Sequence, residues 1–290
     1  MKKIFTLAVI LILARLPLWV IQIIGVFVGK IFHIIKKDTK KILIENITQS
    51  RLYDCDKALK EAIMINIQET GKTLMESLSI WSSSQSRVLG WIKKIHNEEV
   101  IENALKKPQG IIFLTPHLGC YEITSLYYAS SNPITVLYRP ARRAWLNQFM
   151  IKGRMKGMVK LAPTDKSGIK LIIQALKKGE AVGILPDQAA NKGEGEWASF
   201  FGRPAYTMVL VSRLAKKTGA TIIMAYGQRL GLGQGFSIHL KEIETKNITS
   251  PSALNLELEK QIRKNPAQYL WNYDKHKGYL DYIHGKERKN

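Results

Sequence analysis

Short apolar runs alternate with longer segments of helical periodicity over most of the chain after residue 110. The apolar runs of strand length occupy residues 110–115, 133–138, 181–185, 221–227 and 236–241. Segments with apolar residues at helical spacing follow or separate them, at residues 121–129, 145–156, 169–178, 205–217 and 252–264. Strands that alternate with helices are typical of an α/β fold. We therefore predict a single α/β domain with a mostly parallel or mixed central sheet flanked by helices.

The chain before residue 110 lacks this alternation. Residues 40–105 carry apolar side chains at helical spacing, with a serine-rich break at residues 82–86. This pattern predicts a layer of helices that covers the sheet. We find no candidate chemistry in this layer.

Residues 4–35 form the most apolar part of the sequence. The run shows no small-residue cleavage pattern of a signal peptide, so we predict an N-terminal hydrophobic membrane-anchor helix within residues 1–35 and the α/β domain at 36–290. The run is long enough to cross a bilayer. Arg15, Pro17 and Gln22 would be costly at the centre of a membrane, so a spanning helix and a helix in the interface both remain open.

The distribution of charge predicts how the anchor is oriented in the membrane and what class of partner the protein binds. Lysines flank the apolar run on both sides, with more of them after it than before it: Lys2 and Lys3, then Lys30, Lys36, Lys37, Lys40 and Lys41. The positive-inside rule then places the rest of the chain in the cytoplasm. The net charge of +21 and the pI near 9.9 favour an anionic partner, such as a membrane surface, a phosphorylated lipid, an acidic protein or nucleic acid. The two cysteines, Cys55 and Cys120, are too few for a disulfide framework.

The candidate chemistry lies where the first apolar run ends, in the sequence Thr115-Pro-His-Leu-Gly-Cys-Tyr-Glu122. His117 and Glu122 would point roughly 140° apart within one continuous helix. They can meet only if His117 occupies the turn after the strand and Glu122 the first turn of the helix. Open α/β folds place their chemistry at this edge of the sheet. A carboxylate that orients an imidazole makes it a general base for a hydroxyl nucleophile. Cys120 fits better as a small buried residue than as a nucleophile.

The motif resembles the H-x-x-x-x-D/E signature of the glycerolipid and lysophospholipid acyltransferase superfamily. Leu118-Gly119 after the histidine is similar to the branch that acylates lipid A, the late acyltransferases of the lauroyl and myristoyl type. The likeness spans roughly residues 40–278 and includes four further segments: Tyr138-Arg139-Pro140 with Arg154, Pro186-Asp187-Gln188, residues 200–207 and residues 265–271. Lys275-His276-Lys277 departs from the Arg-Phe-Lys element usual in these proteins.

The resemblance implies a membrane-bound O-acyltransferase of the bacterial inner membrane, with its catalytic domain on the cytoplasmic face. An acyl carrier protein would supply the acyl thioester, and a hydroxyl of a phosphorylated lipid A precursor would accept the acyl chain. His117 would act as the base and Glu122 would orient it, with backbone amides near Gly119 binding the oxyanion. Neither a cofactor nor a metal is implied.

A dense basic segment after the catalytic motif suits a phosphorylated substrate, because arginine binds phosphate in a bidentate manner. Within this segment, we predict Arg154 as the main candidate for substrate binding and Arg139 as the second candidate. Asp187, after another strand, would hold Arg154 or a polar group of the substrate, and Arg203 would either meet a phosphate or cap its loop.

Three other functions remain open. An acyltransferase with another lysophospholipid or glycolipid acceptor would use the same base. A hydrolase would use His117 to activate water on the thioester. A basic protein without enzymatic activity would bind an anionic membrane or nucleic acid, but the chain shows no interleaved aromatic and basic pattern of the RNA-binding kind, so nucleic acid is the least favoured partner. Metal-ligand spacings and phosphate-binding glycine loops are absent from the sequence.

Overall fold

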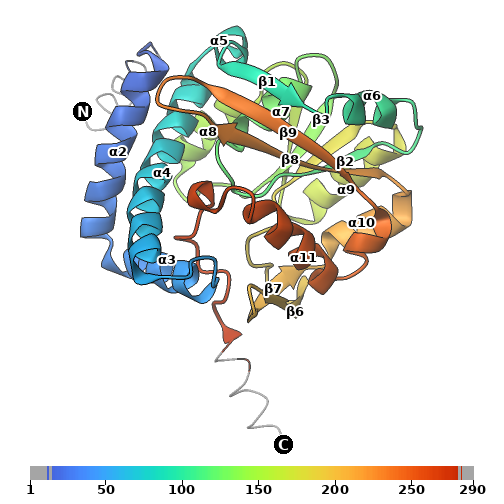
Figure 1. The fold of residues 1–290 in the computed structure, drawn as a ribbon. Helices are drawn as coiled ribbons and strands as arrows, with labels where there is room; N and C mark the ends of the chain where they lie inside the picture. Colours follow the sequence, from blue (N-terminus) through green and yellow to red (C-terminus); the bar gives the residue numbers. More distant parts are fainter. Residues whose placement is uncertain (1–11, 13–14, 280–281, 283–290) are drawn as a thin grey trace, which may run out of the picture.

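The computed structural model describes residue 12, residues 15–279 and residue 282. Its centre is a seven-stranded sheet with the order β1-β9-β8-β2-β5-β3-β4 (Figure 1). All neighbouring pairs are parallel except β8 and β9, which are antiparallel. The predicted α/β domain with a mostly parallel, mixed sheet is therefore confirmed. The strands are β1 (Ile92–His96), β2 (Ile111–Leu114), β3 (Ile134–Tyr138), β4 (Val159–Pro163), β5 (Ala181–Ile184), β8 (Thr221–Arg229) and β9 (Phe236–Ile243).

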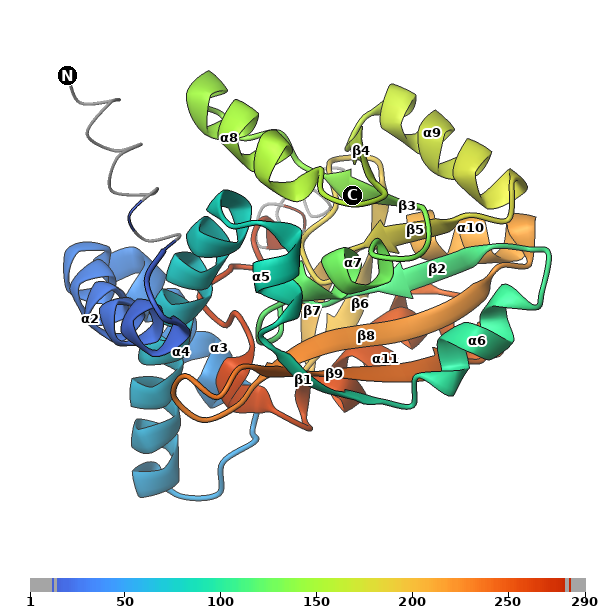
Figure 2. The same cartoon turned by 90° about the horizontal axis from the view of Figure 1, so that it is seen from above.

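Helices cover both faces of this sheet, as the burial of β2 on both sides requires (Figure 2). Ile112 and Leu114 of β2 belong to a core shared with α9, α10 and α11, whereas Ile111 and Phe113 face a second core shared with α6 and α7. The helices are α2 (Leu18–Ile35), α3 (Lys37–Gln49), α4 (Asp56–Ser82), α5 (Gln85–Leu89), α6 (Glu99–Leu105), α7 (Glu122–Tyr128), α8 (Ala144–Arg154), α9 (Lys166–Lys177), α10 (Leu210–Thr218) and α11 (Pro251–Ile262).

Two parts of the fold differ from the prediction. The segment predicted as a loop and the start of a helix near residue 205 instead form an antiparallel hairpin, β6 (Gly195–Phe200) and β7 (Arg203–Met208). Phe201 and Gly202 both adopt positive φ and form the tight turn that matches the twist of a hairpin. The other difference is β1, a short edge strand inside the segment predicted to be helical. Two consecutive exposed lysines interrupt the alternation of apolar and polar residues in this strand, so the sequence pattern did not predict it.

The described part of the predicted anchor, α2, packs along α4 in both views (Figure 1, Figure 2). Gly25 and Gly29 of α2 meet Gly71 of α4 so closely that a Cβ atom on Gly71 would lie 2.0 Å from the Gly25 carbonyl oxygen. Among the described residues, α2 is the one helix long and apolar enough to cross a membrane. The first part of the predicted anchor, residues 4–11 and 13–14, lies outside the described residues.

Candidate active site

The turn of residues 115–121 connects β2 to α7. We call it the catalytic turn because it carries the predicted base, His117. Gly119 has a φ of +62°, and a Cβ there would lie 2.1 Å from the carbonyl oxygen of Gly227 in β8. The turn therefore requires glycine at this position. The backbone of His117 is fixed as well, because its carbonyl accepts a hydrogen bond of 3.0 Å from the Leu270 N–H.

The imidazole of His117 is held by Asp187, which follows β5. Nδ1 lies 2.9 Å from Asp187 Oδ1, and the backbone N–H of His117 donates to Asp187 Oδ2, also over 2.9 Å. Asp187 is buried, which alone would raise the pKa of its carboxyl, but the contacts with His117 lower that pKa overall. An ionised carboxylate at Nδ1 fixes the tautomer with the proton on Nδ1. His117 Nε2 then carries the lone pair, and the Gln188 side-chain nitrogen lies 3.3 Å from it.

Glu122 does not orient His117, so this part of the prediction is wrong. Its buried carboxylate binds the Arg154 guanidinium of α8 instead, with Arg154 Nε 3.0 Å from Oε2 and 3.2 Å from Oε1. Burial would lower the pKa of Arg154, but Glu122 reverses that effect and raises it. The guanidinium also lies over the Trp81 ring, 5.3 Å from its centre.

The prediction that Asp187 holds Arg154 is also wrong, because Asp187 binds His117 and Arg154 binds Glu122. A contact between Asp187 and a substrate stays a prediction. The sequence placed Asp187 at a strand end but did not reveal that β5 is the neighbour of β2 in the sheet. That adjacency brings together two residues 70 positions apart. Their shared place after parallel strands was the signal available in the sequence.

The structure separates the other predicted binding residues. Arg139 is exposed, lines the candidate cavity and donates to Asn191 Oδ1 over 2.7 Å. Arg203 is away from the cavity, where it forms an ion pair of 2.7 Å with Glu45. The predicted contact of Arg203 with a substrate phosphate is therefore not supported.

The three amides at and beside Gly119 are already engaged, which contradicts the prediction that they bind the oxyanion. The Gly119 N–H donates to the Gln268 carbonyl over 3.0 Å, and the Cys120 N–H donates to the Gly227 carbonyl over 2.8 Å. The Leu118 N–H donates to the Pro116 carbonyl over 2.7 Å. An oxyanion would need other donors.

A cavity of about 550 Å³ opens beside His117, and Glu122 and Arg154 also lie at its wall. Its lining is largely apolar and includes Phe113, Ile134, Val136, Val159, Leu161 and Leu185. Gly183 lies among them, where a Cβ would be 3.3 Å from Val136 Cγ2. Arg139, Lys166 and Arg213 add positive charge to the lining. This arrangement suits a ligand with an apolar chain and an anionic end.

Sequence reasoning missed two residues beside the imidazole. Tyr121 packs its ring edge-on to His117, with ring centres 4.8 Å apart, and Gln188 faces Nε2. Burial raises the pKa of the Cys120 thiol well above its usual value, which disfavours a thiolate nucleophile there. Among the described residues no group of three or more acidic, histidine or cysteine side chains is arranged to hold a metal ion.

Comparison with known proteins identifies the family. The model for bacterial lipid A biosynthesis acyltransferases matches residues 2–277. The chain belongs to this family. It is 24% identical to a lipid A biosynthesis palmitoleoyltransferase of Escherichia coli over 272 residues, 92% of this chain and 88% of the relative. It is also 24% identical to the lauroyltransferase of that organism, over 91% and 88% of the two chains, and to its myristoyltransferase, over 60% and 55%. As a member of the lipid A acyltransferase family, the protein is an acyltransferase.

Proposed function

We propose that the protein transfers a fatty acyl chain from an acyl carrier protein thioester to a hydroxyl of a phosphorylated lipid A precursor. The observation that carries this proposal is the position of His117, which lies at the wall of a largely apolar cavity while Asp187 holds its Nδ1. Family membership supports the acyl transfer and the lipid acceptor.

In the proposed mechanism, Nε2 of His117 takes the proton of the acceptor hydroxyl as its oxygen attacks the thioester carbonyl. Asp187 stabilises the imidazolium that forms, as a carboxylate behind a catalytic histidine does. The tetrahedral intermediate then collapses, the C–S bond breaks, and the imidazolium returns its proton to the leaving thiolate. Gln188, whose amide nitrogen lies 3.3 Å from Nε2, is the side-chain donor we assign to the oxyanion.

The charged residues of the cavity divide between the two ends of the substrate. Glu122 and Arg154 fix each other beside the imidazole and shape the wall against which the acceptor hydroxyl lies. Arg139, Lys166 and Arg213 supply positive charge for the acceptor phosphates, and the exposed Arg142 and Arg143 extend it to an acidic carrier protein.

We also propose that residues 1–35 anchor the domain of residues 36–290 to the cytoplasmic face of the bacterial inner membrane. The outer side of α2 exposes Phe27, Ile31, Ile34 and Ile35, and lysines follow it at positions 36 and 37. Apolar side chains beside lysines suit a helix that lies in the interface of an anionic membrane. Because Gly25 and Gly29 are packed against α4, this in-plane arrangement fits α2 better than a free span.

The test is an assay of the purified protein with radiolabelled acyl carrier protein, with and without the lipid acceptor. We expect acylated lipid to form only with the acceptor, and His117→Ala to lower the rate by at least about 100-fold. His96→Ala, which changes a histidine on β1 outside the cavity, is the matched control.

Three outcomes would favour another function. Free fatty acid released at a rate independent of acceptor would indicate a hydrolase. Transfer to a lysophospholipid but not to the lipid A precursor would indicate another acceptor. Full complementation of an acyltransferase-deficient strain by His117→Ala would contradict the enzymatic mechanism and favour a binding protein.

A further inference from the structure

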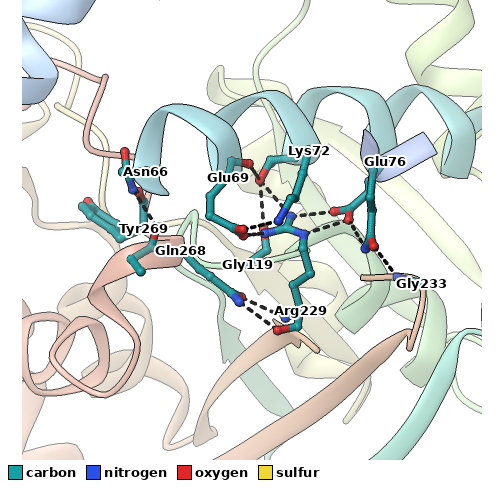
Figure 3. A network of polar contacts seen from close by, with 12 residues as sticks. Asn66, Glu69, Lys72, Glu76, Gly119, Arg229, Gly233, Gln268 and Tyr269 are labelled. Carbon is teal, nitrogen blue, oxygen red and sulfur yellow. Dashed lines mark hydrogen bonds and ion pairs between the residues drawn. The ribbon is translucent and has the colours of Figure 1, made fainter. Parts of the chain in front are cut away.

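A group of buried charges lies between α4 and the end of β8, outside the cavity (Figure 3). Arg229 is at its centre. Its Nε donates to Glu76 Oε1 over 2.7 Å and its Nη2 to Glu76 Oε2 over 2.5 Å, while Nη1 binds Glu69. Lys72 completes the set with a contact of 2.6 Å to Glu69 Oε1. We call these four residues the Arg229 cluster.

Stability alone is a weak explanation for this cluster. The Arg229 side chain is 1% exposed and that of Glu76 is 0% exposed. Burying charges costs solvation, and well-packed apolar residues often replace a buried ion pair without loss of stability. Burial would raise the pKa of Glu69, but Arg229 and Lys72 lower it overall, so the carboxylate stays ionised. The contacts between the cluster and the neighbouring segments point to a further role.

On one side the cluster reaches the catalytic turn through Gln268. The side chain of Gln268 accepts from the Arg229 N–H over 2.8 Å and donates to the Arg229 carbonyl over 2.8 Å. The Gln268 carbonyl accepts from the Gly119 N–H, and the Leu270 N–H donates to the His117 carbonyl, each over 3.0 Å. Asn66 of α4 holds the same segment through the carbonyls of Ala267 and Tyr269, at 2.8 and 2.7 Å. The backbone around His117 is thus attached to residues 267–270.

On the other side the cluster reaches α2 through Gln22. Its side-chain nitrogen donates to Glu76 Oε1 over 2.8 Å, and its side-chain oxygen accepts from the Gly233 N–H over 2.7 Å. Gln22 is fully buried, although it belongs to the apolar helix whose outer side is exposed. Continuous polar contacts therefore connect α2 to the catalytic turn through Glu76, Arg229 and Gln268.

We infer that Gln268 and the Arg229 cluster are positioning residues, which fix the catalytic turn relative to α2. None of them lines the cavity, so they act on the reaction through the backbone of Gly119 and His117. The inference rests on the proposed function, because it assigns the positioned residue as the catalytic base. A displacement of about 1 Å at such a base costs on the order of 100-fold in rate.

The test compares Gln268→Leu with Gln228→Leu. Both variants remove a glutamine side-chain amide. The Gln228 side chain hydrogen-bonds to His239 and, among the described residues, to no residue of the turn or of residues 267–270. For Gln268→Leu we expect kcat to fall about tenfold or more with KM within about twofold, because the change affects the reacting geometry rather than binding. Hydrogen exchange should also accelerate in the peptide that covers residues 115–122. Gln228→Leu should change neither quantity.

Equal kcat values and equal exchange of residues 115–122 in the two variants would overturn the inference. The exchange measurement does not depend on activity, so it judges the positioning role even if the wild-type protein shows no acyl transfer and the proposed function fails. Glu76→Gln, which keeps the shape of the side chain and removes its charge, serves as a second variant if Gln268→Leu does not fold. It should also accelerate exchange in the turn.

A separate variant tests the connection between α2 and the catalytic turn. Gln22→Leu removes both hydrogen bonds of that side chain and keeps an apolar residue in the helix. We expect faster exchange in residues 115–122 as well as in α2. A change confined to α2 would contradict the connection between the helix and the catalytic turn.

Discussion

At the scale of single residues, Asp187 determines what His117 can do. One carboxylate binds both the ring and the backbone N–H of the histidine. In the proposed mechanism, the proton on Nδ1, the orientation of the ring and the stabilisation of the imidazolium therefore all depend on the same side chain.

We expect Asp187→Asn to lower kcat by on the order of 10²- to 10⁴-fold, since an amide keeps the shape of the residue but cannot stabilise the imidazolium or select its tautomer. Steady-state acyl transfer by the folded variant measures this effect. Asp54→Asn, at an exposed position outside the cavity, is the matched control. Retention of full kcat by Asp187→Asn would show that the carboxylate has no part in the reaction.

For the pair of Glu122 and Arg154, we predict an effect on the free energy of unfolding. Arg154→Met would leave the buried Glu122 carboxylate without its partner and should reduce the free energy of unfolding by about 3–5 kcal/mol. The double variant Glu122→Gln with Arg154→Met removes both charges and should recover much of that loss. Urea denaturation of the wild type, both single variants and the double variant measures the coupling. Strictly additive losses would contradict a direct interaction between the two side chains.

The sequence indicated single candidate residues better than it indicated their partners, because the partners come from distant parts of the chain. The sequence singled out His117 because it follows a buried strand and precedes Leu118-Gly119, and its role as the base stays a prediction. Its partner was assigned to Glu122 because sequence proximity was the available guide, whereas the actual partner comes from a neighbouring strand. The role of Arg154 in binding the substrate stays a prediction. Its contact with Glu122 was not predicted, because that contact depends on how α8 folds back, which no local pattern specifies.

At the scale of elements, the apolar periodicity of the sequence located most strands and helices of the α/β domain. The exceptions were β1, β6 and β7. These strands lie at a sheet edge or in a hairpin, where one side is exposed and the apolar alternation is weak. The order of the strands in the sheet was not predictable from the pattern, and this order decides which strand ends share the site.

Strand β5 sets the room available in the cavity at Gly183. We expect Gly183→Ala to shift the preferred acyl donor toward shorter chains, because the added methyl group lies among the apolar lining residues, 3.3 Å from Val136 Cγ2. Competition between acyl carrier proteins of different chain length measures the shift. Val182→Ile enlarges the neighbouring residue on the opposite side of the same strand and should leave the preference unchanged. An unaltered preference in Gly183→Ala would place the acyl chain elsewhere.

Helix α2 predicts a separable membrane contact. Phe27, Ile31 and Ile34 are 55–68% exposed, so replacing all three with Asp should abolish sedimentation with anionic vesicles while the melting temperature changes little. Leu256→Asp, at a position of α11 that is 55% exposed, is the control for an added charge at an apolar site. Undiminished vesicle binding by the triple variant would exclude this side of α2 as the contact.

At the scale of the whole molecule, the net charge of +21 acts together with the exposed apolar side of α2. We expect binding to anionic vesicles to weaken strongly as salt rises from about 0.1 M to about 1 M, because the Debye length falls from about 10 Å to about 3 Å. Binding to zwitterionic vesicles should depend much less on salt. A sedimentation series in both lipids tests this, and an equal salt dependence would contradict a role for the charge.

The contacts of residues 267–270 with the catalytic turn have a consequence for how the enzyme is made. During synthesis, His117 and Asp187 leave the ribosome long before the segment that supplies the bonds to His117 and Gly119. A nascent chain that already contains the complete pair therefore lacks the support that sets its geometry. If His117 is the base, we expect acyl transfer to begin only after residues 267–270 have left the ribosome and joined the turn.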